Sequence, residues 1–423
     1  MDDATVKPAT LGATLVPLLA IAVFINYVDR GNLATAAPLI KEQLRMSSTQ
    51  IGLLLSAFFW TYVPAQLLAG WLAERVNPYR TLAIGLALWS IATAVSGLAS
   101  GFITFIALRM LLGIGESAAF PCTAKLLALN LPSTRLGSAN GLIAAGLALG
   151  PAFGTFAGGL LMARIGWRSV FLLFGLLSLS WLIPWHAATR QASARINQQP
   201  RGRLPSFAMI SKRMEIWGAS LGHFCANYSF YFVISWLPLY LVKQRGLSLS
   251  LMAEIGGLIY FVYAASSLLT GLLTDRLIRA GNSASRVRRT CVVAAQVIVA
   301  GCLVAAASGN AAVSVISLFF AGAAFGLHAP NLYAIGQTLA GPRAAGKWMG
   351  IQNCIGNIAG IVAPIITGFV VDRTGQFYWA FIIAAAVAMT GTIGWGLMIR
   401  KVALIDWSDS RPADPIPTAA RKP

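Results

Sequence analysis

Four charged residues fall inside apolar stretches that are long enough to cross a lipid bilayer. Asp29 and Arg30 are adjacent in the first such stretch, and Arg109 and Glu116 lie seven residues apart in another. A charge at such a depth is costly unless it faces a wet cavity, has a partner or takes part in chemistry. A buried carboxylate can take up and release a proton, and the planar fork of a guanidinium matches a carboxylate. These residue types therefore indicate the movement of protons and the binding of an organic anion.

The composition is that of a polytopic membrane protein. The 423 residues are 57% hydrophobic and only 11% charged, with a mean hydropathy of +0.71, whereas soluble domains carry about a quarter charged residues. The net charge of +19 does not indicate nucleic-acid binding, because the basic residues fall between apolar runs rather than on one face with interleaved aromatics. The five cysteines have no metal-binding spacing. We therefore expect a lipid bilayer around the chain, and neither a nucleic-acid partner, a metal site nor a disulfide framework.

The apolar runs predict an all-α membrane protein with twelve transmembrane helices in two six-helix halves. Each run is near the length of about 20 residues that spans a bilayer. The predicted helices are residues 12–37, 50–73, 80–99, 102–128, 137–161, 167–186, 215–242, 251–275, 289–307, 311–340, 346–372 and 376–399. The predicted domains are an N-terminal half at 1–186, a polar cytoplasmic linker at 187–214, a C-terminal half at 215–400 and a cytoplasmic tail at 401–423.

The distribution of Lys and Arg predicts the orientation. With these helices, 23 basic residues fall on the side of the two termini and 7 on the opposite side. Cytoplasmic loops carry the excess of Lys and Arg, so both termini are expected in the cytoplasm. No cleavable signal peptide is expected, because the first apolar run is too long for one.

A short pattern repeats at equivalent places in the two predicted halves. Gly-x-x-x-acid-Arg occurs at Gly70–Arg75 and again at Gly271–Arg276. Two six-helix halves with parallel repeats are typical of alternating-access transporters, and the chain resembles the major facilitator superfamily. In the loop signature of that superfamily, Glu74 replaces the usual Asp and Asn77 a usual Gly.

Helix geometry predicts which charges meet. Helix 1 runs outward and helix 4 inward, so a rise of about 1.5 Å per residue puts Asp29, Arg30 and Arg109 at one depth and Glu116 two turns deeper. Because helices 1 and 4 of this fold line a central cavity, we predict the pairs Asp29–Arg109 and Arg30–Glu116. The alternative is that the acids only fix helix contacts through buried hydrogen bonds.

Five motifs resemble those of one subfamily, the anion:cation symporters. That family includes bacterial importers of hexonates, glucarate, phthalate and tartrate, and the animal sialin and vesicular glutamate carriers. The motifs are NYVDRGNL at 26–33, RMLLGIGE at 109–116 with FP at 120–121, GWRSVF at 166–171, WLPLYL at 236–241, and NCIGNIAG at 353–360 followed by Pro364.

The resemblance implies roles for eight residues. Asp29 and Glu116 would couple protons, and Arg30 would contact the substrate carboxylate. The other candidate substrate-binding residues are Tyr27, Tyr62, Arg109, Asn353 and Asn357. For the tyrosines, packing between helices is the alternative. For the asparagines the alternative is a bridge between helices, and the sequence leaves open which of the two contacts substrate.

The expected function is import of a small organic anion, a sugar acid or another carboxylate, by proton symport through alternating access. The proton gradient would supply the energy without a cofactor, in a monomer in the bacterial cytoplasmic (inner) membrane. The alternative is a proton-coupled antiporter or exporter of organic anions or drugs, and Gly150-Pro151 is similar to a drug-antiporter signature. An enzyme is not expected, because no HExxH or GxSxG motif occurs and the His and Cys residues are scattered.

The sequence predicts no functional role for the three histidines. His328 precedes Pro330 and Asn331 in a helix expected near the cavity, where packing is favoured over substrate binding. His186 and His223 are expected near helix ends, with no role.

Overall fold

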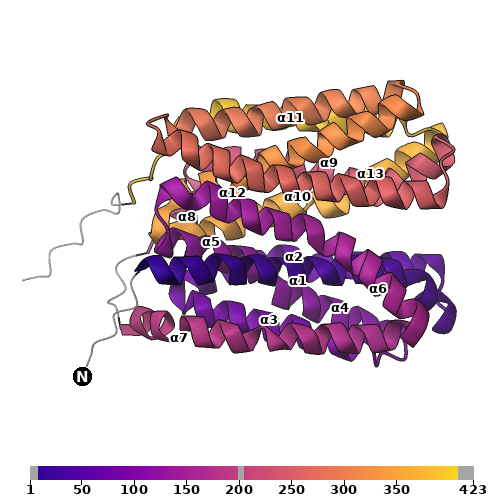
Figure 1. Ribbon diagram of the computed structural model, residues 1–423, viewed down its shortest axis with the longest axis horizontal. Helices are drawn as coiled ribbons and strands as arrows, with labels where there is room; N and C mark the ends of the chain where they lie inside the picture. Colours follow the sequence, from indigo (N-terminus) through magenta and orange to yellow (C-terminus); the bar gives the residue numbers. More distant parts are fainter. Residues whose placement is uncertain (1–7, 199–203, 408–423) are drawn as a thin grey trace, which may run out of the picture.

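The computed structural model describes residues 8–198 and 204–407, and over these residues its regular structure is helical throughout. The long helices run roughly side by side along the longest axis of the molecule (Figure 1). Residues 1–7, 199–203 and 408–423 lie outside the described part, and with them both predicted termini, the middle of the predicted linker and most of the predicted tail.

The helices fall into a first and a second group along the chain, on either side of residues 199–203. The first group is α1 Pro8–Gln43, α2 Ser48–Arg75, α3 Pro78–Ser96, α4 Phe102–Glu116, α5 Ala119–Asn130, η1 Ser133–Arg135, α6 Leu136–Ser180 and α7 Leu182–Gln198. The second group is α8 Phe207–Ser211, α9 Met214–Leu239, η2 Tyr240–Gln244, α10 Leu249–Arg279, α11 Ala284–Ser308, α12 Ala311–Asn357, α13 Ala359–Thr374, α14 Tyr378–Ile393 and η3 Gly394–Met398.

Ten helical segments of the described chain are long and apolar enough to cross a membrane, and two of them are long enough to cross it twice. Ser133–Ile196 and Ala311–Thr374 each have 64 residues, which at 1.5 Å per residue would reach about 96 Å, roughly three times the hydrocarbon thickness. The helical path is interrupted at Gly166 (φ 76°) and at Gly341 (φ 61°). These positive φ angles are unfavourable for residues other than glycine. Counted as two crossings each, the two segments bring the total to the predicted twelve.

The span predicted over 102–128 is confirmed as one membrane-crossing segment, Phe102–Asn130. Within it a short turn separates α4, which ends at Glu116, from α5, which begins at Ala119. Ala118 donates its backbone N–H to the Gly115 carbonyl at 3.3 Å, so a tighter turn replaces the α-helical pattern directly after the buried acid.

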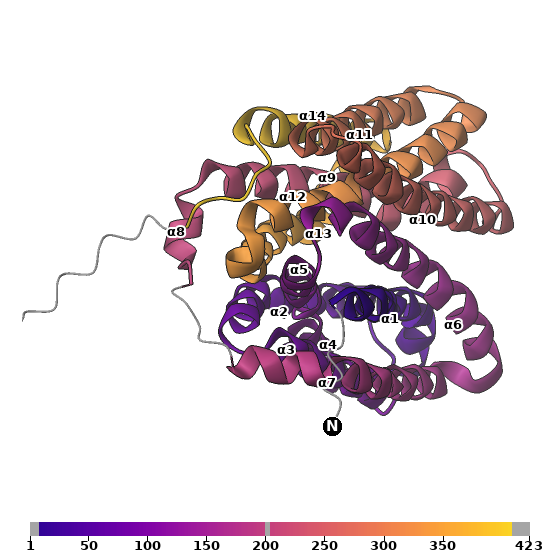
Figure 2. The ribbon, with the colours of Figure 1, turned by 60° about the vertical axis from the view of Figure 1, so that its left-hand side comes forward.

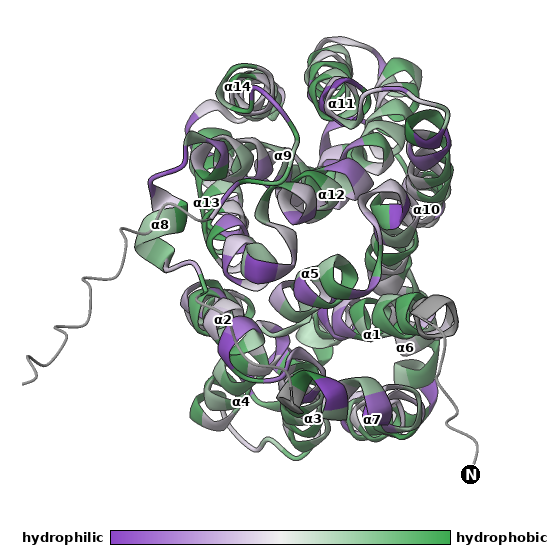
Figure 3. Cartoon of the chain, turned by 90° about the vertical axis from the view of Figure 1, so that its left-hand side faces the viewer, coloured by the Kyte–Doolittle hydropathy of each residue, from purple (hydrophilic) through white to green (hydrophobic). Residues whose placement is uncertain are grey.

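The outer surface suits lipid. Large apolar side chains stand exposed along the helices, among them Ile103 (77%), Phe156 (72%) and Leu397 (72%). Figure 3 shows the hydropathy over the ribbon from the end at which α1 begins. A soluble protein does not expose so much contiguous apolar surface.

Close packing of α1 on α6 sets the position of the charged segment. The Cβ that any other residue would add at Gly150 would lie 2.6 Å from Cβ of Tyr27 and 2.7 Å from the Phe24 carbonyl oxygen. Small residues at such a crossing let two membrane helices approach closely. Gly150 therefore fixes how far Tyr27, and with it Arg30, reaches into the bundle.

The first prediction concerns this crossing. Gly150→Ala should lower the melting temperature of the purified protein, because overpacking of a well-filled contact costs about 1–3 kcal/mol. Gly159→Ala on the same helix is the control, since its added Cβ would meet only Thr35 Cγ2, at 3.4 Å. Equal melting temperatures for the two variants would contradict the packing argument.

The two groups meet closely at one end of the bundle, which we call the latched end. It is the end at which α1 begins, on the left of Figure 1. There α2 packs on α12 and α6 on α10, and glycines allow the contacts: Gly70 faces Gly350, and Gly141 faces Gly271. Figure 2 shows α6 reaching along the second group beside α10.

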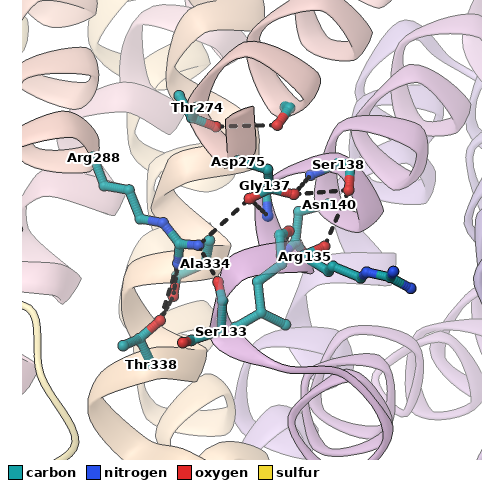
Figure 4. Close-up of polar contacts among 12 residues, drawn as sticks. Ser133, Arg135, Gly137, Ser138, Asn140, Thr274, Asp275, Arg288, Ala334 and Thr338 are labelled. Carbon is teal, nitrogen blue, oxygen red and sulfur yellow. Dashed lines mark hydrogen bonds and ion pairs between the residues drawn. The ribbon is translucent and has the colours of Figure 1, made fainter. Parts of the chain in front are cut away.

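One acid of the repeated pattern binds the start of α6 at this end (Figure 4). Asp275 on α10 accepts hydrogen bonds from the backbone N–H groups of Gly137 (2.9 Å) and Ser138 (2.7 Å) and from the Ser138 hydroxyl (2.7 Å). The Arg288 guanidinium lies 3.7 Å from the same carboxylate and donates to the Ser133 carbonyl. A carboxylate at a helix N-terminus is stabilised by the free N–H groups and the helix dipole, so this contact joins the groups.

The other acid of the repeated pattern, which lies in the first group, makes the equivalent contact with the second group. Glu74 on α2 accepts from the Gly346 backbone N–H at 2.8 Å, just after the Gly341 break in α12. It also pairs with Lys125, which in turn donates to the Pro342 carbonyl. The weak sequence repeat therefore corresponds to two crossed contacts between the groups.

The second prediction is that Asp275→Asn opens the latched end. Loss of the charge leaves buried Arg288 without its ion partner and should weaken the closed conformation by on the order of 2–3 kcal/mol. Distances between spin labels at the latched ends of α6 and α10 would then shift to longer values. Asp372→Asn, at an exposed position on α13, is the control, and unchanged distances in Asp275→Asn would refute the role of this contact.

Candidate functional site

The pair Arg30–Glu116 forms as predicted. Nη2 of Arg30 lies 3.2 Å from Oε2 of Glu116. The Glu116 side chain is fully buried, and its Oε1 has no hydrogen-bond partner among the described residues. α1 supplies the arginine, and the last residue of α4 supplies the acid, where the helix breaks. One carboxylate oxygen is therefore engaged and the other remains able to receive a proton.

Three aromatic rings surround the Arg30 guanidinium. Its Cζ lies 4.3 Å from the ring centre of Tyr27, 4.8 Å from that of Phe58 and 5.1 Å from that of Tyr62. Phe58 and Tyr62 stack on each other on α2, with centroids 4.7 Å apart. Cation–π contacts stabilise a charge in a dry place without neutralising it, so these rings support the Arg30 charge alongside Glu116.

The predicted pair Asp29–Arg109 does not form within the described part of the chain. Asp29 accepts a hydrogen bond from the Thr93 hydroxyl on α3 at 2.9 Å. The Arg109 guanidinium instead lies 5.1 Å from the Phe58 ring. Arg30 and Arg109 thus contact the same ring, which agrees with their predicted common depth, whereas Asp29 is hydrogen-bonded to α3. Thr93 was missed, because a lone Thr in an apolar helix carries no signal.

A small cavity of about 40 Å³ lies beside Arg30, between helices of both groups. Such a volume holds only a few water molecules, so the helices must part before a larger ligand enters. Its polar and aromatic lining consists of Tyr27, Phe120, His223, Asn227, Phe230, Tyr231, Tyr263, Phe325, His328, Tyr333, Asn353 and Asn357.

Hydrogen bonds lead from Arg30 into the second group. Nη1 of Arg30 donates to the Tyr231 hydroxyl at 3.5 Å, and that hydroxyl donates to Oδ1 of Asn357 at 2.9 Å. Asn357 donates in turn to the backbone carbonyl of Asn353 at 2.9 Å. Neither amide atom of the Asn353 side chain has a partner among the described residues.

The predicted site residues therefore fall into three sets according to their position relative to the cavity. Tyr27, Asn353 and Asn357 line the cavity, and Arg30 with Glu116 lies directly behind Tyr27 and Tyr231. The remaining three, Asp29, Tyr62 and Arg109, are buried outside that lining. Within the described chain, no group of three or more His, Cys, Asp or Glu side chains is placed to hold a metal ion.

A transmembrane helical bundle with buried, partnered charges beside a cavity between two groups of helices defines a polytopic membrane transporter. A family model described as Major Facilitator Superfamily matches residues 19–364 and again 280–422. The chain belongs to the Major Facilitator Superfamily. The resemblance seen in the motifs is confirmed, and the membership makes the chain a multi-pass transporter rather than an enzyme.

Curated relatives match almost the whole chain. The probable L-galactonate transporter of Escherichia coli is 30% identical, over 92% of this chain and 89% of the relative. The probable sulfoacetate transporter SauU of Cupriavidus necator is 29% identical, over 93% and 95%. The hexuronate transporter of Bacillus subtilis is 28% identical, over 91% and 94%.

Solved structures agree on the fold. The proton:xylose symporter XylE superposes with a TM-score of 0.73 at 14% identity, over 93% of this chain and 97% of that one. The human organic anion transporter MFSD10 gives 0.72 at 16% identity, over 90% and 99%. At such identities the likeness concerns architecture alone.

Proposed function

We propose that this protein is a secondary active transporter that imports a small organic anion, a sugar acid or another carboxylate, together with protons. The observation that carries the proposal is the buried Arg30–Glu116 pair at 3.2 Å beside a cavity between the two groups of helices. The relatives named above are a probable sulfoacetate transporter, a probable L-galactonate transporter and a hexuronate transporter, and all three named substrates are organic acids.

In the proposed mechanism, substrate competes with Glu116 for Arg30. The guanidinium offers several donors in a fixed fork, and its aromatic surroundings leave its charge unneutralised. When Glu116 is protonated it no longer holds Arg30 as an ion pair, and a substrate carboxylate takes its place. Asn353 or Asn357 binds the rest of the molecule, and the unbonded amide of Asn353 favours Asn353. Tyr27 forms part of the wall of the cavity. Tyr62 and Arg109 lie outside that lining and do not contact the substrate directly in this proposal.

Proton release completes the cycle. Opening toward the cytoplasm wets the site and favours ionised acids, so Glu116 recaptures Arg30 and displaces the anion. Asp29, held by Thr93 on the other side of α1, is the second proton carrier in this proposal. If both acids bind a proton outside and release it inside while one monoanion is carried, transport moves net positive charge inward.

The two halves, residues 1–186 and 215–400, rock about this site. In this proposal the latched end faces the cytoplasm, because cytoplasmic loops carry the excess of Lys and Arg. The described conformation is then closed to the cytoplasm by the Glu74 and Asp275 contacts. The proposed location is the bacterial inner membrane, where a monomer would draw on the proton gradient without a cofactor.

The third prediction tests proton coupling. Glu116→Gln preserves the shape of the acid but cannot exchange a proton. In proteoliposomes with labelled D-galactonate as the probe, this variant should lose accumulation driven by an inward proton gradient and keep counterflow exchange. Glu254→Gln, at an exposed position on α10, should behave as wild type.

Two results would count against this mechanism. Continued accumulation against the gradient by Glu116→Gln would remove Glu116 from proton coupling. Inhibition of wild-type uptake by an inward proton gradient would favour the second candidate, a proton-coupled antiporter or exporter of organic anions or drugs.

The fourth prediction concerns Arg30. Arg30→Lys keeps the charge but loses the fork, so the dissociation constant for D-galactonate should rise about 10- to 100-fold, as expected for loss of a charged hydrogen bond. Isothermal titration calorimetry measures it, with Arg373→Lys, at an exposed position on α13, as the control. An unchanged constant would remove Arg30 from the substrate site.

A further inference from the structure

Two buried imidazoles face the cavity from the second group of helices and take no part in the contacts described above. His223 on α9 and His328 on α12 both line the cavity, and their exposed fractions are only 3% and 5%. Within the described residues, Nδ1 of His223 and Nε2 of His328 have no hydrogen-bond partner. Since buried polar atoms in proteins are nearly always bonded, these two nitrogens call for a partner that enters through the cavity.

Packing holds both rings in place. The His223 ring lies edge-on to Tyr333, with centroids 6.0 Å apart, and the His328 ring lies 5.7 Å from the Trp395 ring. A Cβ at position 356 would come within 2.8 Å of Cγ of His223, so Gly356 leaves the space that this imidazole occupies. Rings fixed in this way are preorganised for a ligand. The expectation that His223 lies near a helix end was wrong, since it lies well inside α9 (Met214–Leu239).

Asn353 adds a third unbonded group to the same wall. Its side chain is 1% exposed, lines the cavity and has no partner for either amide atom among the described residues. A neutral imidazole and an amide each both donate and accept hydrogen bonds, as hydroxyl groups do. The residues that line the cavity include no Lys, Arg, Asp or Glu. A second acidic group would thus be buried there without a cation, which is costly, whereas hydroxyl groups would be matched.

The spacing along α9 sets the length of the ligand. His223, Asn227 and Tyr231 follow at intervals of four residues and all line the cavity, so they share one face of the helix. Tyr231 lies 3.5 Å from Arg30, and His223 is about 12 Å further along the helix axis at 1.5 Å per residue. A two-carbon acid bound to Arg30 is too short to approach His223, whereas an extended six-carbon acid approaches it.

We propose that His223, His328 and Asn353 form a subsite for the hydroxyl-bearing end of an extended monocarboxylic acid whose carboxylate binds Arg30. This proposal rests on the proposed function and narrows its substrate class to polyhydroxylated monocarboxylates. The chemistry of the wall disfavours diacids of equal length and acids without hydroxyl groups.

The fifth prediction uses three six-carbon acids on the full-length protein in lipid nanodiscs. D-galactonate ends in a hydroxyl, galactarate replaces that end by a second carboxylate, and hexanoate has no hydroxyl groups. Isothermal titration calorimetry should show D-galactonate binding at least about tenfold more tightly than either. His223→Leu and His328→Leu should each weaken D-galactonate binding about fivefold, the size of one uncharged hydrogen bond, and leave hexanoate binding unchanged.

Two further variants sharpen the test. His328→Gln keeps a donor and an acceptor and should retain most of the affinity for D-galactonate. His186→Leu alters the histidine of α7, which is exposed outside the cavity, and should change nothing. The comparison of the three acids uses only the wild-type protein, so it still tests the proposal if a variant fails to fold.

Each other outcome overturns the subsite. Galactarate binding as tightly as D-galactonate, or histidine variants that bind D-galactonate as the wild type does, would refute it. If Arg30→Lys still weakened binding in that case, the proposed function would stand and only the subsite would fall. Wild-type protein that binds none of the three acids would refute the subsite, and binding that does not depend on Arg30 would refute both.

Discussion

Arg30 carries a permanent charge into the interior of a helical bundle, and much of the site is arranged around the need to hold it there. A guanidinium cannot shed its charge by losing a proton, so its surroundings must compensate for lost hydration. Three aromatic rings from α1 and α2 and one carboxylate from α4 do so. This arrangement is stable without substrate and yet exchangeable, because a single carboxylate can be replaced by another.

The same helices connect this site to the latched end. α5 starts three residues after Glu116, and its Lys125 pairs with Glu74 there. α12 carries His328 and Asn353 at the cavity and receives the Glu74 contact at Gly346. A shift of either helix on a change of charge at Arg30 and Glu116 would thus reach the contacts that hold the two groups together. In a close-packed bundle such shifts move whole helices rather than single side chains.

Sequence reasoning succeeded where the signal is energetic and local. Long apolar runs predicted the helices, and the count of crossings follows once Gly166 and Gly341 are recognised as breaks. The Arg30–Glu116 pair was predicted from helix geometry together with the expectation that helices 1 and 4 of this fold line a central cavity. The Asp29–Arg109 pair failed because depth says nothing about rotation around a helix axis, and Asp29 faces Thr93 on α3. The turn after Glu116 inside the span Phe102–Asn130 was not predicted. His223 was misjudged, although the predicted helix 215–242 already contained it away from its ends.

The amino-acid sequence by itself determined that this chain is a helical membrane protein, which residues are charged within the bilayer and how the basic residues are distributed. These properties follow from hydrophobicity and segment length, which need no knowledge of neighbours. Only the tertiary structure decided which acid holds Arg30, that the repeated acids cap helices of the opposite group, and that two histidines face one cavity. Each of these depends on which faces of distant helices meet, and close packing at positions such as Gly150 and Gly356 sets that meeting.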